Sequence, residues 1–141
     1  MNNEYKQITF EDGYIQKTTG SVTQKPDNAL TELIANAWDA GSKLVNITIP
    51  SEEHEKLIIE DDGIGMTEDE FNQRWLTLSY NRIKNQGMDV EFPPEIQGIK
   101  RKAYGRNGIG RHSMFCFSSS YHIDTWKNGK CFSCDVDLSS G

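Results

Sequence analysis

Residues 31–40 read TELIANAWDA and carry polar side chains at positions that share one face of a helix. At about 3.6 residues per turn, Glu32, Asn36 and Asp39 lie on one narrow stripe. The opposite side is apolar and holds Leu30, Leu33, Ile34, Ala37 and Trp38. Asn and Asp in the middle of a helix compete for its backbone hydrogen bonds, so the stripe costs stability. It indicates either a surface that faces a ligand, which would offset this cost, or an ordinary solvated face.

The chain has 141 residues, which suits one compact domain. Its 35% hydrophobic and 10% aromatic content predicts a modest core and argues against disorder. No apolar run approaches the ~20 residues that a membrane span needs. The polar start at residues 1–7 shows no secretory signal. We therefore expect a cytoplasmic protein with no membrane partner.

The net charge of −6 argues against a strongly basic surface for nucleic acid. We expect nucleic acid to be bound, if at all, only through other domains. The positive charges nevertheless gather among glycines in the second half: Arg82, Lys84, Lys100, Arg101, Lys102, Arg106 and Arg111. This local basic region fits either a small polyanion or a solvated loop.

Three cysteines make an odd count and no disulfide framework: Cys116, Cys131 and Cys134. Cys131 and Cys134 have the spacing of zinc ligands, but no second pair accompanies them and they lie in an expected strand. A metal or redox role for this pair is therefore not the favoured interpretation.

The first third of the chain predicts a strand and a helix. Ile8 and Phe10 belong to a short alternating run that is typical of an edge strand. Asp27 or Asn28 is expected to cap the start of the helix, and Gly41 is expected to end it.

A hairpin and a second helix are expected next. Two half-buried strands at residues 44–49 and 56–60 are joined by a polar turn. Thr67 and Glu70 then have the spacing of a capping box, which predicts a helix through about Leu76.

Residues 77–104 lack periodicity and are long for an unstructured connection, so they indicate a functional lid or disorder. A helical run follows at 114–117. Alternating runs at 121–126 and 131–138 flank Asn128–Gly129, a strong hairpin signal. Hairpins with helices packed on them predict an α+β sandwich whose antiparallel-rich sheet has helices on one face.

The stretch DDGIGM follows the second strand of the first hairpin. Gly63 and Gly65 permit a positive φ and let a ligand approach the backbone closely. Asp61 ends the strand and could accept a hydrogen bond from an exocyclic amine such as that of adenine. Met66 is a soft apolar side chain that suits packing against a flat ring. Alone, this motif is often only a turn.

A second glycine motif, G-x-x-G-x-G, is formed by Gly105, Gly108 and Gly110 ahead of a helical run. It presents consecutive amides and the positive end of a helix to an anion, which suits phosphate. The spacing is neither that of the dinucleotide fingerprint nor that of a P-loop. Alone, it indicates either a phosphate site or a flexible turn.

In chain order the motifs are E-x-x-x-N-x-x-D-A on a helix, D-x-G-x-G after a strand and G-x-x-G-x-G before a helix. This combination, over about residues 28–117, resembles the GHKL superfamily of Bergerat-fold ATPases, which includes gyrase, heat-shock-protein-90 chaperones, histidine kinases and MutL. The resemblance implies a two-layer sandwich with a mixed, mostly antiparallel sheet. It also implies a single ATP-binding domain over 1–141, truncated on its C-terminal side, with an ATP lid at about 77–110.

The resemblance assigns roles to individual residues. Asn36 would bind the magnesium ion that bridges the phosphates, and Glu32 would position or deprotonate the attacking water as general base. Asp61 would receive the adenine amine, directly and through water, with Met66 beside the ring. The other nucleotide-binding positions that it implies are Asp39, Ala40, Gly63, Gly65, Gly105, Gly108, Ile109 and Gly110.

Asp39 followed by Ala40 resembles the MutL-like and heat-shock-protein-90-like branches, whereas histidine kinases usually show Asn-Ala-x-Lys there. By analogy with the chaperone-like and Microrchidia branches, Ser79, Arg82 or Lys84 would contact phosphate. The threonine that closes the pocket in the family has no counterpart that we identify, and Thr125 is not expected to fill this role.

The favoured interpretation is an ATP-binding, Mg²⁺-dependent ATP-hydrolysing domain of a larger protein. Bound nucleotide would close the lid, control partner domains and favour a homodimer. The lysine or arginine that completes catalysis normally comes from a following domain, so weak hydrolysis is expected. The alternatives are a histidine-kinase-type domain that transfers phosphate to a protein, and a non-hydrolysing nucleotide-binding or interaction module.

Overall fold

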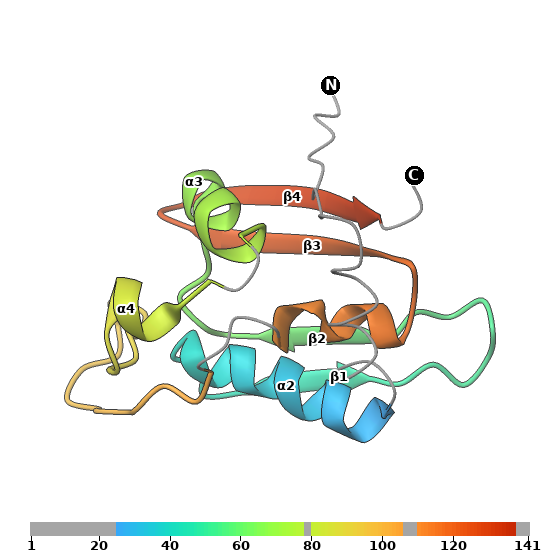
Figure 1. Ribbon diagram of the computed structural model, residues 1–141, viewed down its shortest axis with the longest axis horizontal. Coiled ribbons are helices and arrows are strands. Elements are labelled where there is room, and N and C mark those ends of the chain that lie inside the picture. Colours follow the sequence, from blue (N-terminus) through green and yellow to red (C-terminus); the bar gives the residue numbers. More distant parts are fainter. Residues whose placement is uncertain (1–24, 78–79, 106–109, 138–141) are drawn as a thin grey trace.

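The computed structural model describes residues 25–77, 80–105 and 110–137 (Figure 1). In these residues the helical elements are α2 (Pro26–Asp39), α3 (Glu68–Glu70), η1 (Phe71–Trp75), α4 (Arg82–Gln86) and η2 (Gly110–Cys116). The strands are β1 (Val45–Thr48), β2 (Ile58–Asp61), β3 (Ser120–Lys127) and β4 (Lys130–Asp137). The predicted α+β class is confirmed. The edge strand predicted at Ile8 and Phe10 lies outside the described residues.

The strands form two antiparallel hairpins, as the turn signals predicted. β1 pairs with β2, with Val45 opposite Asp61, and β3 pairs with β4, with Lys127 opposite Lys130. The turn between β3 and β4 has positive φ at both Asn128–Gly129 positions, 54° and 72°, as a two-residue hairpin turn of this type requires. Among the described strands, no ladder joins one hairpin to the other.

The start of α2 differs from the prediction. Lys25 is the N-cap and no side chain caps the helix, so the assignment of Asp27 or Asn28 as the cap was wrong. The physical reason is Pro26, which occupies the first helical turn. Its fixed φ suits that position, and its missing N–H would be unsatisfied there in any case. Asp27 consequently lies inside the first turn, where its charge is favourable.

The end of α2 is bound by a cation from a distant part of the chain. The Nη1 of Arg101 donates hydrogen bonds to the carbonyl of Trp38 at 3.1 Å and to that of Ser42 at 2.8 Å. Its guanidinium carbon lies 4.0 Å from the centroid of the Trp38 ring and 5.0 Å from that of Phe92. A cation at a helix C-terminus satisfies carbonyls that have no partner in the helix. Arg101 therefore has a structural role in the basic region.

The second predicted helix begins as expected but continues differently. The capping box of Thr67 and Glu70 is present, with both of its hydrogen bonds. After α3, however, the chain widens into the π-helical turn η1, in which the Leu76 N–H donates to the carbonyl of Phe71 at 3.1 Å. Phe71 is fully buried there and stacks on Trp75. A tertiary requirement thus overrides regular helix geometry.

The core that η1 completes lies against the second hairpin. Its buried members are Phe71, Cys134 and Val136, and its partly buried members are Met66, Trp75, Leu76, Phe115, Tyr121, Ile123 and Phe132. Cys134 is buried and Cys131 is exposed, as expected for two positions three residues apart on opposite faces of β4. They therefore do not point toward a common ligand.

Two further segments position the cleft described below. η2 packs against α2, and Figure 1 shows the two lying next to each other. The segment without periodicity contains the short helix α4, whose start is capped by Asn81, and an isolated bridge between Asp89 and Lys102. Among the described helices, none has the length and apolarity of a membrane span.

Replacing Arg101 by Met should lower the free energy of unfolding by about 2 kcal/mol, because two hydrogen bonds from a cation to the end of α2 are lost. Urea titration followed by circular dichroism measures this. Lys102→Met is the matched control, since Lys102 forms an exposed ion pair with Asp89 that should contribute less than about 1 kcal/mol. Equal losses in the two variants would contradict the role of Arg101.

Candidate functional site

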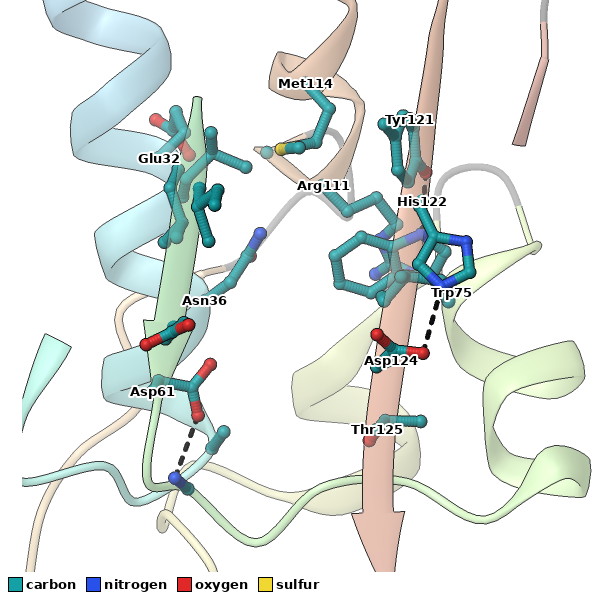
Figure 2. Close-up of a pocket in the computed structure, with 18 of the residues that line it drawn as sticks. Glu32, Asn36, Asp61, Trp75, Arg111, Met114, Tyr121, His122, Asp124 and Thr125 are labelled. Carbon is teal, nitrogen blue, oxygen red and sulfur yellow. Dashed lines mark hydrogen bonds and ion pairs between the residues drawn. The ribbon is translucent and has the colours of Figure 1, made fainter. Parts of the chain in front are cut away.

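One cleft of about 2360 Å³ runs between α2 and β3 (Figure 2). Ten predicted site residues line it: Glu32, Asn36, Asp39, Ala40, Asp61, Gly63, Gly65, Met66, Gly105 and Gly110. Lys84 does not line it, and Gly108 and Ile109 lie outside the described residues. The volume exceeds the roughly 300–1,000 Å³ of typical ligand pockets, so the lining cannot all contact one small ligand. The chemistry of individual side chains must locate the site within it.

Asn36 presents the least satisfied polar group of the α2 wall. Its side-chain Nδ2 is buried and has no hydrogen-bond partner among the described residues. Leaving a buried polar group unpaired costs about 1–3 kcal/mol, and such groups in folded proteins call for an explanation. A ligand in the cleft would provide one, because Figure 2 shows the Asn36 side chain directed into the space between α2 and β3.

Glu32 lies one turn before Asn36 and is bordered by the start of η2. A Cβ placed on Gly110 would lie 2.6 Å from the Glu32 Oε2, so no larger residue fits there without displacing the carboxylate. The second glycine motif and the helix stripe therefore meet at this carboxylate. Both belong to the same wall of the cleft.

Asp39 binds the start of the glycine-rich segment. Its Oδ1 accepts from the Tyr104 N–H at 2.7 Å and its Oδ2 accepts from the Gly105 N–H at 2.8 Å. Both oxygens of the carboxylate are thus engaged by backbone. A Cβ on Gly105 would lie 2.8 Å from Oδ2, which explains the glycine. Asp39 lines the cleft, but its contacts are those of an anchor for the segment that follows.

The loop after β2 is bound to the same end of α2. The Ile64 N–H donates to the carbonyl of Ala40 at 2.7 Å, and a Cβ on Gly63 would lie 2.7 Å from the Cβ of Ala40. Asp61, at the end of β2, accepts from the Gly63 N–H at 2.8 Å. Its carboxylate remains exposed to the cleft, with further lone pairs available.

Asp62 has a different role from its neighbour. Its Oδ1 accepts from the Ser42 Oγ at 2.6 Å and from the backbone N–H groups of Lys43 and Leu44 at 2.8 and 3.0 Å. These hydrogen bonds, with that of Ser42 the strongest, lower the pKa of Asp62 to about 2. In the sequence, nothing distinguishes this structural carboxylate from that of the adjacent Asp61.

The loop after β2 also contacts β3. Gly65 has a φ of +70°, and a Cβ there would collide with the carbonyl oxygen of Trp126. The next residue, Met66, donates its N–H to the buried Oγ1 of Thr125 at 2.9 Å. Thr125 therefore supports this loop, a role the sequence analysis missed. The buried position of Thr125 in an alternating strand was the available signal.

Two predicted site residues are less available to a ligand than their predicted roles suggest: Met66 lines the cleft only in part, and Lys84 does not line it. Met66 packs against the core cluster as well as lining the cleft, so only part of its side chain is available to a ligand. Lys84 is exposed on α4, where its own N–H donates to Asn81. Two other residues of that helix, Arg82 and Gln86, line the cleft in its place.

Aromatic and cationic side chains outside the predicted site residues also line the cleft. The Trp75 Nε1 donates to the Tyr121 hydroxyl at 2.8 Å, and burial raises the pKa of Tyr121 to about 12. The guanidinium carbon of Arg111 lies 5.5 Å from the centroid of the Tyr80 ring. All four side chains line the cleft.

Two histidines near the cleft have opposite environments. His112 in η2 is buried, and neither ring nitrogen has a partner among the described residues. Burial, followed by the charge of Arg111, lowers its pKa to about 4. His122 on β3 contacts the carboxylates of Asp135 and Asp124 at 2.6 and 3.0 Å, and these contacts raise its pKa. Figure 2 shows the contact between His122 and Asp124.

Replacing Asp39 by Asn should release the start of the glycine-rich segment, because an amide has one acceptor oxygen where the carboxylate has two. Amide hydrogen exchange at Tyr104 and Gly105 should become about tenfold faster. Asp89→Asn is the control, since Asp89 is exposed and pairs with Lys102 rather than with this backbone. Unchanged exchange at both amides would contradict the anchoring role.

The two histidines should titrate on opposite sides of the ordinary value of 6.5. The neutral form of His112 is favoured in the folded state. Its contribution to stability is therefore complete above pH 6.5 and is lost as the pH falls toward about 4. His122 has the opposite sign, with stability present below pH 6.5 and lost as the pH rises through its raised pKa.

Proton NMR of the ring Cε1–H resonances measures both pKa values, and His112→Phe assigns the lower one. In that variant the loss of stability between pH 6.5 and about 4 should be smaller than in the unaltered chain. Asp135→Asn should lower the pKa of His122 without moving that of His112. A His112 resonance that titrates near 6.5 would contradict its buried position.

Comparison with known proteins agrees with this geometry. The family model described as "Histidine kinase-, DNA gyrase B-, and HSP90-like ATPase" matches residues 24–140. The DNA mismatch repair protein MutL of Rickettsia canadensis is 43% identical over 90 residues, which cover 58% of this chain and 15% of MutL. MutL of Listeria monocytogenes is 33% identical over 67 residues, which cover 48% of this chain and 11% of that protein.

A putative type II restriction enzyme, HgiDII of Herpetosiphon aurantiacus, is 29% identical over 98 residues, which cover 70% of this chain and 14% of the enzyme. The chain thus spans 11% to 15% of the length of these relatives. The family model covers α2, both hairpins and the glycine-rich segment between them. The chain therefore belongs to the histidine kinase-, DNA gyrase B- and HSP90-like ATPase family.

Proposed function

We propose that this chain binds ATP with Mg²⁺ in the cleft beside α2 and hydrolyses it. The observation that carries the proposal is the convergence of Asn36 and Asp61 on one cleft. The two residues belong to different elements and are separated by the whole of β1. Convergence of a buried amide and an exposed carboxylate suits a ligand with a polar ring at one end and phosphates at the other.

The purine end of the ligand would lie at Asp61. This carboxylate is exposed to the cleft and can accept from the exocyclic amine of adenine while it keeps its hydrogen bond from Gly63. Gly63 and Gly65 allow the loop after Asp61 to pack against Ala40 and Trp126, which holds the Asp61 carboxylate in place at the cleft. The part of Met66 that lines the cleft would contact the face of the ring.

The phosphate end would lie at Asn36. Among the described residues, no group of three or more His, Cys, Asp or Glu side chains could hold a metal ion. Mg²⁺ in nucleotide sites needs few protein ligands, because phosphates and water supply the others. The side chain of Asn36, which is directed into the cleft, would offer its Oδ1 to the ion, and its buried Nδ2, unpartnered among the described residues, would donate to a phosphate oxygen. The ion, held there through the side-chain oxygen, would neutralise charge on the phosphates.

Hydrolysis would depend on Glu32. Its carboxylate lies one helical turn from Asn36, on the same wall, and borders Gly110. A water between this carboxylate and the terminal phosphate could be oriented, and its proton accepted, by Glu32 as general base. The carboxylate lines the cleft and is therefore accessible to such a water.

We further propose that the chain is one ATP-binding domain of a longer protein, with residues 77–110 as its lid. The anchoring of Tyr104 and Gly105 by Asp39 supports a lid whose one end is attached to the nucleotide-binding helix. Nucleotide binding would then close the lid and control partner domains or a homodimer. The net charge of −6 favours contact with nucleic acid through other domains only.

Replacing Glu32 by Gln should leave ATP binding close to that of the unaltered protein and reduce hydrolysis by about 10²–10⁴-fold, because the amide cannot accept the proton of the water. Binding is measured by calorimetry with Mg²⁺ and a non-hydrolysable ATP analogue. Turnover is measured by phosphate release from the intact protein.

Glu95→Gln is the matched control for Glu32→Gln. Glu95 is exposed and does not line the cleft. Unchanged turnover in the Glu32 variant would remove its role as general base. Absence of heat on adding the analogue at millimolar concentration to the unaltered protein would remove the proposed function itself.

A further inference from the structure

We propose that Arg111 binds the terminal phosphate of the nucleotide and makes the site selective for a triphosphate over a diphosphate. The inference rests on the proposed function, because it needs a nucleotide in the cleft. The inference goes beyond the proposed function because it names a cation of this chain that would contact the phosphates. Neither the helix stripe nor the glycine motifs of the sequence contains this residue.

The backbone of Arg111 follows directly on the glycine that borders Glu32, the proposed general base. It follows Gly110, whose missing Cβ would lie 2.6 Å from the Glu32 Oε2. Figure 2 shows the Arg111 side chain extending from η2 toward β3, across the cleft from Asn36 and near Trp75 and Tyr121. Glu32 and Asn36 mark the phosphate end of the cleft, and Asp61 marks the purine end. Arg111 is therefore positioned for the phosphates.

The surroundings of Arg111 suit a guanidinium that binds phosphate. Its guanidinium carbon lies 5.5 Å from the centroid of the Tyr80 ring, within the range of a cation–π contact. One of its terminal nitrogens, Nη1, is buried. Partial burial lowers the local dielectric and strengthens attraction to an anion. The planar fork of arginine also matches the oxygens of a phosphate better than a lysine ammonium does.

The other cations that line the described cleft lie elsewhere. Lys56 precedes β2, at the end of that strand opposite to Asp61. Arg74 on η1 lies 3.7 Å from the Glu70 carboxylate. Arg82 donates to the carbonyls of Asp39 and Gly87 and so braces α4 against the end of α2. Gly110 lies next to the Glu32 carboxylate in space, and among the described lysines and arginines only Arg111 follows it directly in the sequence.

A guanidinium at the terminal phosphate predicts a specific pattern of affinities. ATP has a terminal phosphate that ADP lacks, so the contribution of Arg111 should appear in the affinity for the triphosphate. A residue that only stabilised η2 would affect both nucleotides alike. The ratio of the two affinities therefore separates a phosphate contact from a structural role.

The test measures the affinities of ADP and a non-hydrolysable ATP analogue, both with Mg²⁺, by calorimetry on the full chain and on Arg111→Ala. The affinity for the analogue should fall by about 10- to 100-fold, whereas the affinity for ADP should stay close to that of the unaltered chain. Arg111→Lys should have an intermediate effect, because it keeps the charge and loses the fork. Lys130→Ala is the control, since Lys130 is exposed and does not line the cleft.

Selective loss of analogue affinity, with partial recovery in Arg111→Lys, would support the proposal. Equal loss of both affinities, or no change in either, would overturn it and leave the proposed function intact. If Arg111→Ala fails to fold, Arg111→Lys decides, because an unchanged ratio of the two affinities overturns the proposal. Absence of binding of both nucleotides to the unaltered chain would instead overturn the proposed function, and this inference with it.

Discussion

The rest of the site depends on the hydrogen bonds that the carboxylate of Asp39 accepts from backbone N–H groups. These N–H groups belong to Tyr104 and Gly105, so the last turn of α2 holds the start of the glycine-rich segment. The next residue, Ala40, accepts the N–H of Ile64 from the loop after β2. A helix C-terminus offers carbonyls with no partner in the helix, which makes it a suitable meeting point for distant segments. The walls of the cleft are assembled around this end of α2.

A second set of contacts attaches the loop after β2 to the opposite wall. Gly65 meets the carbonyl of Trp126, and Met66 donates to Thr125 on β3. These contacts join the two hairpins where no ladder joins them among the described strands. The loop that follows Asp61 is thereby held from both sides. This arrangement keeps the ligand-facing groups in place without burying them.

Local signals in the sequence predicted local features of the fold. The capping box of Thr67 and Glu70 and the hairpin turn at Asn128–Gly129 depend on contacts within a few residues, and both are present. The N-cap of α2 was wrong because Pro26 favours the first turn more strongly than the neighbouring polar residues favour the cap. The π-helical turn was missed because it depends on burying Phe71 against a hairpin that lies far along the chain.

The sequence by itself determined which side chains of each element are available for chemistry, because helical and strand periodicity define the faces of an element. It therefore identified the stripe of Glu32 and Asn36 and the carboxylate of Asp61. Only the tertiary structure decided that these groups share one cleft, that Arg111 lines it with them and that Lys84 lies outside it. Periodicity describes one element at a time, whereas convergence depends on how separate elements pack against one another.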